Sequence, residues 1–200
     1  MKTIKLMSLL AISATIFTGC SNDDDSIPEQ VNQEEVVTTM NVTLTGPSGN
    51  IVTLKSYDAD GDGPKAPELT VSGALAANTI YSGEVELLNE TETPVENTTL
   101  EIMEENDEHQ FFFSNSDALE VSFAYADTEN DYDDDPTNDD EDANPVGILF
   151  TLSTLEASSG TVSIVLVHQP DKDASGVVQG DRANAGGEED FVASFPVTIQ

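Results

Sequence analysis

The chain has 200 residues, with 39 acidic and only 6 basic side chains, which gives a formal net charge of −33 at pH 7. This charge repels nucleic acid and anionic membrane surfaces, and it excludes a basic phosphate-binding patch. The single cysteine excludes a disulfide framework, so a folded domain must be held together by its core or by a metal ion.

The first 19 residues are typical of a lipoprotein signal peptide. Two lysines precede an apolar run at 6–17 that is too short to span a bilayer core of about 30 Å. The run ends in IFTGC at 16–20, which resembles a lipobox, the motif in which the cysteine thiol receives a diacylglyceryl group. We therefore expect cleavage before Cys20 and lipidation of Cys20. The alternative is an ordinary secretory signal with an incidental cysteine.

Residues 20–35 are too polar to form a core and predict a flexible acidic tether. Three aspartates at 23–25 resemble the surface-export signal of Bacteroidota lipoproteins, which would place the domain on the outer face of the outer membrane. The alternative is a solvated spacer on a lipoprotein that faces the periplasm. Asp25-Ser26-Ile27 also matches the short O-glycosylation motif of those bacteria, which makes Ser26 a candidate modification site.

Residues 36–200 predict one domain, in which apolar and polar residues alternate repeatedly with the period of a β-strand. Segments 51–57, 69–72 and 146–155 are further strand candidates, and glycine-rich or asparagine-containing turns separate them. About seven to nine short strands without βαβ spacing indicate an antiparallel β-sandwich of the immunoglobulin-like kind. The alternating apolar residues fall at 40, 42 and 44; 81, 83, 85 and 87; 119, 121, 123 and 125; 162, 164 and 166; and 191, 193, 195, 197 and 199.

One segment favours a helix, at about 94–108. Thr93 at the N-cap, Pro94 at the first helical position and Glu96 at the third resemble a capping box. Leu100 and Ile102 also fit an extended conformation. Phe111-Phe112-Phe113 follows, and we expect it to enter the next strand with at least one ring in the core.

The sharpest motif is Asp58-Ala59-Asp60-Gly61-Asp62-Gly63, whose alternate carboxylates resemble the first half of a calcium-binding loop. The twelfth position of an EF-hand would be Leu69 instead of glutamate, so Glu68, one place early, is the remaining candidate ligand. We predict a Ca²⁺ site between two strands, with Asp58, Asp60, Asp62 and Glu68 as ligands. The alternative is an acidic turn without metal.

Residues 127–145 predict a mobile acidic loop, because like charges at this density do not pack without counter-ions. The alternative is a second cation site at Asp131, Asp133 and Asp135. His109 and His168 are the only histidines. A structural, hydrogen-bonded role is expected for each, because no spacing in the sequence joins them into the alternative, half of a transition-metal site.

Several stretches together are similar to small flavobacterial-type Bacteroidota surface lipoproteins without a known activity. They are the lipobox with its acidic start and the segments 60–63, 87–91, 108–112 and 195–199. Such proteins sometimes carry the label "type 1 periplasmic binding fold", but that architecture needs two doubly wound lobes and a longer chain. Against such relatives, 129–142 resembles an insertion, and lipoproteins of this kind often accompany TonB-dependent outer-membrane receptors.

No nucleophile motif or metalloprotease motif is present in the sequence, so we expect no enzymatic activity. The sequence predicts a lipid-anchored, calcium-binding β-sandwich that acts as a binding or accessory module, with ligand capture beside an outer-membrane receptor as one role. The first alternative is an adhesin or structural surface protein whose calcium only stiffens loops. A second alternative is a hydrolase that uses carboxylates.

Overall fold

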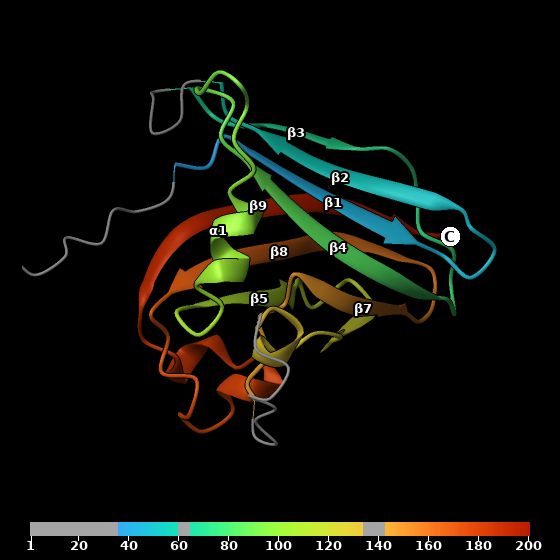
Figure 1. The fold of residues 1–200 in the computed structure, drawn as a ribbon. Coiled ribbons are helices and arrows are strands. Elements are labelled where there is room, and N and C mark those ends of the chain that lie inside the picture. The colour runs from blue at the N-terminus through green and yellow to red at the C-terminus, as the bar shows by residue number, and fades with distance from the viewer. Residues whose placement is uncertain (1–35, 60–64, 134–142) are drawn as a thin grey trace, which may run out of the picture. The chain divides into compact units, whose positions relative to one another are not determined.

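Nine strands and one short α-helix make up the part of the chain that the computed structural model describes, residues 36–59, 65–133 and 143–200 (Figure 1). All of these residues belong to the unit Glu34–Gln200, and the predicted signal peptide and tether lie outside the described residues. The strands are β1 (Thr39–Thr45), β2 (Ile51–Tyr57), β3 (Glu68–Val71), β4 (Ile80–Leu88), β5 (His109–Asn115), β6 (Val121–Tyr125), β7 (Leu149–Thr154), β8 (Ser158–His168) and β9 (Glu188–Ile199); the helix is α1 (Thr99–Glu104).

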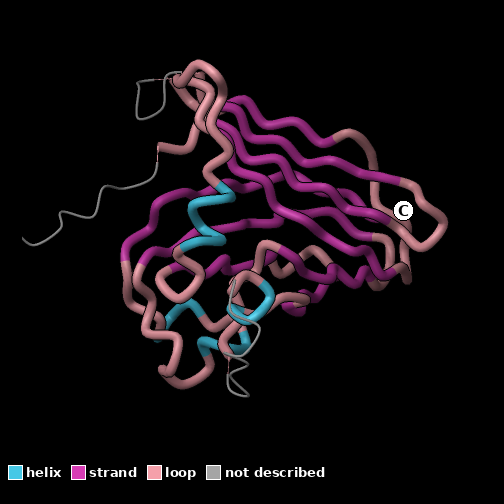
Figure 2. The backbone as a smooth tube through the Cα atoms, in the orientation of Figure 1, coloured by secondary structure: helices cyan, strands magenta, loops and turns pink. Residues whose placement is uncertain are grey.

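The strands form two antiparallel sheets, which confirms the predicted β-sandwich (Figure 2). The larger sheet has the order β3-β2-β1-β4-β7-β6, and the smaller one has the order β5-β8-β9. Along one side, an isolated bridge between Leu75 and Ile199 links the segment after β3 to β9. On the other side, β6 and β5 are the edge strands of their sheets, and the chain crosses there from β5 in the smaller sheet to β6 in the larger one.

The core lies between the inner faces of the two sheets, and the period-two pattern identified most of it correctly. The inward residues of β1, β4, β8 and the last part of β9 are buried, as the alternation predicted. Gly83 takes one of these inward positions because the ring of Phe150 on the neighbouring strand β7 fills the space that a Cβ would need. Phe111 is fully buried in the same core, as expected for the phenylalanine run.

The smaller sheet is covered on its outer face as well. Two 3-10 turns, η2 (Val177–Gln179) and η3 (Arg182–Asn184), follow β8, and Val177 of η2 and Ala185, directly after η3, belong to a second apolar cluster. This cluster contains Phe112, Val167, Val177 and Ala185. The end of the sheet where β5 begins and β8 ends is therefore buried on both faces, which explains four consecutive buried residues at 109–112.

The helix is shorter than the sequence suggested, and the predicted capping box is wrong. Glu96 exchanges two backbone hydrogen bonds with Asn89 in an isolated antiparallel bridge, so the chain at 94–98 is not helical. The helix begins at Thr99, whose backbone N–H donates to the side chain of Asn97. It ends at Glu104, since the chain must extend by His109 to enter β5.

Candidate metal centre

The structure brings together three residues that are far apart in the sequence. His109 is the first residue of β5 and His168 is the last residue of β8, and the antiparallel register pairs them directly across the two strands. Asp190 lies on β9, the next strand of the same sheet. One ligand atom from each of the three residues lies within 4.8 Å of the other two.

A β-bulge turns Asp190 toward the histidines. The register between β8 and β9 shifts between Leu166, which pairs with Phe191, and Val167, which pairs with Glu189. Asp190 is therefore the extra residue, and such an insertion redirects a side chain that would otherwise alternate to the outer face. The Asp190 side chain has no exposed surface, although it is an ionisable group at the end of a strand.

Gly187 permits the close approach of β9 to the end of β8. Its φ is +69°, a left-handed conformation that L side chains rarely adopt. A Cβ at this position would collide with the carbonyl oxygen of His168. Gly187 therefore sets how closely the strand that carries Asp190 approaches His168.

The carboxylate of Asp190 is buried and accepts no hydrogen bond from any residue in the described ranges. Its Oδ2 lies 3.6 Å from His109 Nε2, and its Oδ1 lies 3.9 Å from His168 Nδ1. Charge-assisted hydrogen bonds are about 2.7–2.9 Å long, so both distances exceed a direct bond. A buried charge without hydrogen-bond donors is costly, and a cation between these atoms would offset that cost.

Each histidine also has an oxygen acceptor on the side away from Asp190. His109 Nδ1 lies 3.2 Å from the carbonyl oxygen of Glu105, which can only accept a hydrogen bond, so Nδ1 carries the proton. In the neutral ring, the Nε2 lone pair then faces Asp190. His168 Nε2 lies 3.5 Å from the Glu108 carboxylate, which leaves Nδ1 on the Asp190 side.

This outer arrangement is the one that orients histidine ligands in metal sites, where the second ring nitrogen faces a carbonyl or carboxylate oxygen. The Glu108 carboxylate is itself held by the amide of Gln169, which donates a hydrogen bond of 2.9 Å. That hydrogen bond, with a smaller contribution from His168, lowers the pKa of Glu108. Glu108 is therefore an ionised acceptor for the outer nitrogen of His168 at neutral pH.

The two distances from Asp190 to the histidine nitrogens are close to those expected around a small divalent ion. With metal–ligand bonds of about 2.0–2.2 Å and tetrahedral angles, a nitrogen and an oxygen on one zinc ion lie about 3.4 Å apart. The observed separations from Asp190 are 3.6 and 3.9 Å. The two imidazole rings are stacked at 4.7 Å with an interplanar angle of 10°. An ion in the plane of both rings needs these planes to tilt, so binding requires rotation of at least one ring about χ2.

The donor set is two imidazole nitrogens and one carboxylate oxygen, which suits zinc and similar transition ions and does not suit calcium, which takes six to eight oxygens. The side chains of His109 and Asp190 have no exposed surface, and that of His168 is 6 % exposed. A substrate therefore has no direct path to the ion position. Chemically, the arrangement can hold an ion and tie three strands together.

Of the residues that the sequence singled out for calcium, the two that the structure describes, Asp58 and Glu68, lie at the larger sheet and not in this centre. Asp58 follows β2, and Glu68 begins β3 opposite Tyr57, so both stand at the same end of one pair of strands. Asp60 and Asp62 lie outside the described residues, as do Cys20, Ser26 and Asp135. Asp131 accepts hydrogen bonds from the backbone and hydroxyl of Thr128 and thereby caps a 3-10 turn, η1 (Glu129–Asp131).

The first part of the acidic segment is fastened to the domain by Asp127. This buried carboxylate accepts hydrogen bonds from the backbone N–H groups of Gly147 and Leu149, at 2.7 and 2.8 Å, and from the Tyr132 hydroxyl at 2.7 Å. Lys172, also buried, donates to Glu129 at 2.8 Å. Among the described residues of this segment, these acidic side chains therefore serve as structural acceptors.

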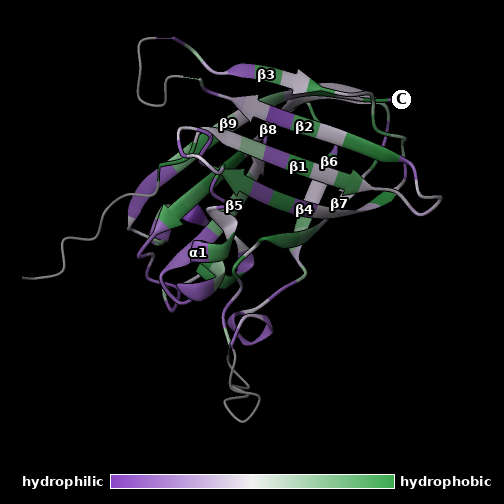
Figure 3. Cartoon of the chain, turned by 45° about the horizontal axis from the view of Figure 1, so that its top comes forward, coloured by the Kyte–Doolittle hydropathy of each residue, from purple (hydrophilic) through white to green (hydrophobic). Residues whose placement is uncertain are grey.

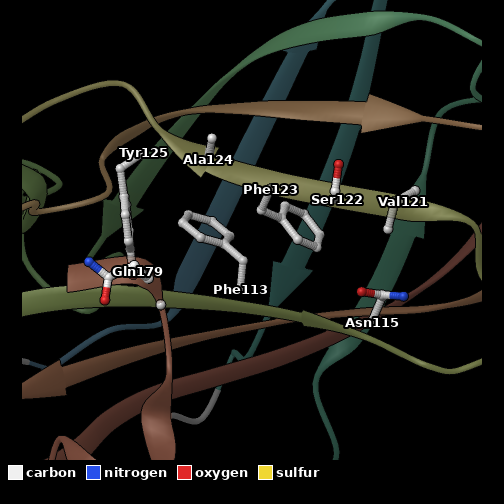
Figure 4. A pocket seen from close by; sticks show the side chains of 9 residues that line it. Phe113, Asn115, Val121, Ser122, Phe123, Ala124, Tyr125 and Gln179 are labelled. Carbon is white, nitrogen blue, oxygen red and sulfur yellow. The ribbon is translucent and has the colours of Figure 1, made fainter. Parts of the chain in front are cut away.

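A hollow also lies at the side of the sandwich where β5 and β6 are the edge strands (Figure 4). It has a volume of about 270 Å³, and Phe113, Phe123 and Tyr125 form its aromatic wall. The Tyr125 hydroxyl donates to the Phe111 carbonyl and accepts from Gln110, and burial raises the pKa of Tyr125 to about 12. This cavity therefore offers aromatic contact together with the amides of Asn115 and Gln179 and the Ser122 hydroxyl, and its lining holds no group for acid–base chemistry at neutral pH.

Sequence reasoning found both histidines but did not join them to Asp190. Comparison with known proteins adds no further residue, since no protein-family model, curated protein or solved structure matches this chain. Within the described ranges, no helix has the length and apolar character needed to cross a membrane. The candidate centre therefore rests on its own geometry.

Proposed function

We propose that this chain is a lipid-anchored, extracytoplasmic binding module whose β-sandwich holds a divalent transition ion, of the zinc type, between His109, His168 and Asp190. The observation that carries the metal proposal is the Asp190 carboxylate, which is buried, accepts no hydrogen bond from the described residues and faces two imidazole nitrogens. The outer acceptors of both histidines support the same assignment.

The ion would act as a structural clamp. Its three ligands come from β5, β8 and β9, the three strands of the smaller sheet. The chain has one cysteine, so a metal ion is the cross-link open to this domain outside the cytoplasm. An ion that binds only the folded state stabilises it by about 2.7 kcal/mol when its free concentration is a hundredfold above Kd.

Isothermal titration of the chelator-treated protein with zinc tests the metal proposal. We expect one site whose heat is lost in the His168→Ala variant and kept in Glu188→Gln, a change at an exposed neighbour of Asp190 on the same strand. Weak, multisite heats that are the same in both variants would instead assign zinc to the acidic surface and overturn the proposal.

The proposed lipid anchor depends on Cys20, and the proposed surface display depends on the aspartates at 23–25. The Cys20→Ala variant is expected to leave the membrane fraction or to accumulate as the precursor. Protease added to intact cells is expected to remove the domain, and alanines at 23–25 are expected to protect it. Membrane fractionation of Cys20→Ala at mature size, or equal protease protection of both forms, would contradict the anchor or the surface display, respectively.

Calcium binding by Asp58, Asp60, Asp62 and Glu68 stays a second proposal, supported by the strand pairing that places Asp58 and Glu68 at one end of the hairpin. Millimolar calcium is expected to raise the melting temperature at fixed ionic strength, and Asp60→Ala with Asp62→Ala is expected to remove most of the increase. An unchanged calcium response in the double variant would exclude this loop. Co-purification with an outer-membrane receptor would separate a capture module from an adhesin.

A further inference from the structure

A groove runs along α1 on the outer side of the larger sheet. One part has a volume of about 230 Å³ and is lined by Glu84 and Glu86 of β4 and by Leu100 and Met103 of α1. The next part has a volume of about 470 Å³ and also contains Leu100 and Met103. The two parts therefore share an apolar floor, and Figure 3 shows α1 with hydrophobic and hydrophilic residues side by side.

The apolar floor is exposed although the helix has a well-packed opposite face. Ile102 is fully buried in the core, whereas Leu100 on the same helix is 56 % exposed. One exposed leucine is ordinary on a protein surface. Here, however, Leu100 borders both hollows and adjoins the half-buried Met103, a flexible and polarisable side chain that adapts to different partners.

The rim of the groove is acidic and contains no basic side chain among its described residues. Glu84 and Glu86 lie on β4, Glu104 lies on the helix, and Asp133 lines the second part. The negative charge of the rim also acts on Tyr132, which lines the groove. Burial and the hydrogen bond to Asp127 contribute most to the raised pKa of Tyr132, and the charge of Glu84 adds to the increase.

The four basic residues that follow the predicted signal peptide are not part of this rim, although the buried Lys172 donates to the Asn106 carbonyl behind it. Lys172 is buried and bonded to Glu129, and Arg182 lies beside Glu189. Lys55 lies beside Glu90, and Lys65 precedes β3. None of these four side chains lines the groove. A basic partner would therefore meet uncompensated carboxylates on this surface and would replace the solvent ions that screen them.

The groove is also held in shape before any partner binds. Thr99, at the start of α1, accepts a hydrogen bond from the Leu87 backbone N–H at 2.7 Å and donates to the Leu87 carbonyl, so the helix is tied to β4. Asn41 donates to Glu86 at 3.0 Å and orients that carboxylate. A preformed surface loses less entropy on binding than one that must be ordered.

We propose that this groove binds a basic peptide segment of a partner protein, in which lysine or arginine residues flank an apolar side chain. The apolar side chain would pack on Leu100 and Met103, and the basic side chains would lie against Glu84, Glu86 and Glu104. This inference names the partner class of the proposed binding module, but it does not depend on the metal centre.

Fluorescently labelled hexapeptides test the proposal by anisotropy titration at physiological ionic strength. The probe KLKKLK is expected to bind about tenfold more tightly than KSKKSK, which has the same charge and no apolar side chain. Leu100→Ser is expected to remove most of this preference. Leu155→Ser, the same change at a leucine of 50 % exposure elsewhere, is the matched control and is expected to keep it.

A paired charge test separates the groove from the overall acidity of the chain. Glu84→Gln with Glu86→Gln is expected to weaken KLKKLK binding several-fold, whereas Asp117→Asn with Glu120→Gln, two exposed acids near β6, is expected to leave it within about twofold. Equal affinities for both peptides, equal effects of the matched variants, or no binding of KLKKLK at about 1 mM would overturn the proposal. Zinc titration of the same variants reports on the metal centre separately.

Discussion

Replacement of Asp190 by asparagine distinguishes a metal ligand from an ordinary buried ion-pair partner. Asparagine keeps the size of the side chain and removes its charge. Without metal, the buried carboxylate accepts no hydrogen bond from the described residues, so its loss relieves a desolvation cost. We expect the metal-free Asp190→Asn variant to be as stable as the original protein, or more stable by about 1 kcal/mol.

With zinc, the original protein is expected to become more stable than the Asp190→Asn variant. The original protein gains about 2.7 kcal/mol when free zinc is a hundredfold above Kd. For a domain of this size, about 1 kcal/mol shifts the melting temperature by about 2–4 °C, so the expected rise is about 5–11 °C. The variant gains much less, because a neutral amide oxygen is a weaker ligand than a carboxylate.

Differential scanning calorimetry of both proteins, with a chelator and then with zinc, measures the four stabilities. Magnesium at equal ionic strength controls for charge screening, and Glu188→Gln controls for any loss of negative charge near the site. Equal destabilisation of Asp190→Asn with and without zinc would rule out Asp190 as a metal ligand. In that case the carboxylate would serve the fold as a partner of His109 and His168 alone.

Three further predictions concern the framework around the centre. Gly187→Ala is expected to lower the free energy of unfolding by about 2 kcal/mol and to weaken the zinc response, because φ is positive and a Cβ would collide with His168; an unchanged urea midpoint and zinc response would contradict this. Asp127→Ala is expected to cost about 3 kcal/mol in urea denaturation, because it leaves two backbone N–H groups and the Tyr132 hydroxyl without their acceptor; a loss below about 0.5 kcal/mol would count against that role. Burial raises the pKa of Tyr125 to about 12, so Tyr125 ionises first in the unfolded chain, and the free energy of unfolding is expected to fall between about pH 10 and 12. A constant free energy of unfolding over that range, with Tyr125 and Tyr132 both titrating near pH 10 by ultraviolet absorbance, would contradict the burial of these two tyrosines.

The alternation of apolar and polar residues predicted the sandwich, because in a strand with one buried face every second side chain points into the core. The inward residues of β1 and β4 are buried as the pattern required, for example Met40 and Tyr81. The helix was predicted too long because Glu96 pairs with Asn89, a non-local contact that local capping signals do not contain. Such tertiary pairing outweighs a cap worth about 1 kcal/mol.

The metal centre could not be predicted from the sequence for a different reason. His109 and His168 are 59 positions apart, and only the register of β5 with β8 makes them neighbours. Period-two patterns assign faces but do not fix which strands pair or in which register. Asp190 was harder still, because a bulge reverses the face that simple alternation assigns to it. The one signal in the sequence was the position of Asp190, which follows the glycine pair at 186–187 and directly precedes the apolar strand residues that begin at Phe191.

Crystals of the protein soaked with zinc, measured on both sides of the zinc absorption edge, locate any ion bound between His109, His168 and Asp190. One strong anomalous peak is expected about 2.0–2.2 Å from His109 Nε2, His168 Nδ1 and an Asp190 carboxylate oxygen, with the imidazole planes tilted from their stacked position. Peaks confined to the acidic surface, with the three side chains unmoved and no density between them, would contradict the proposed metal centre.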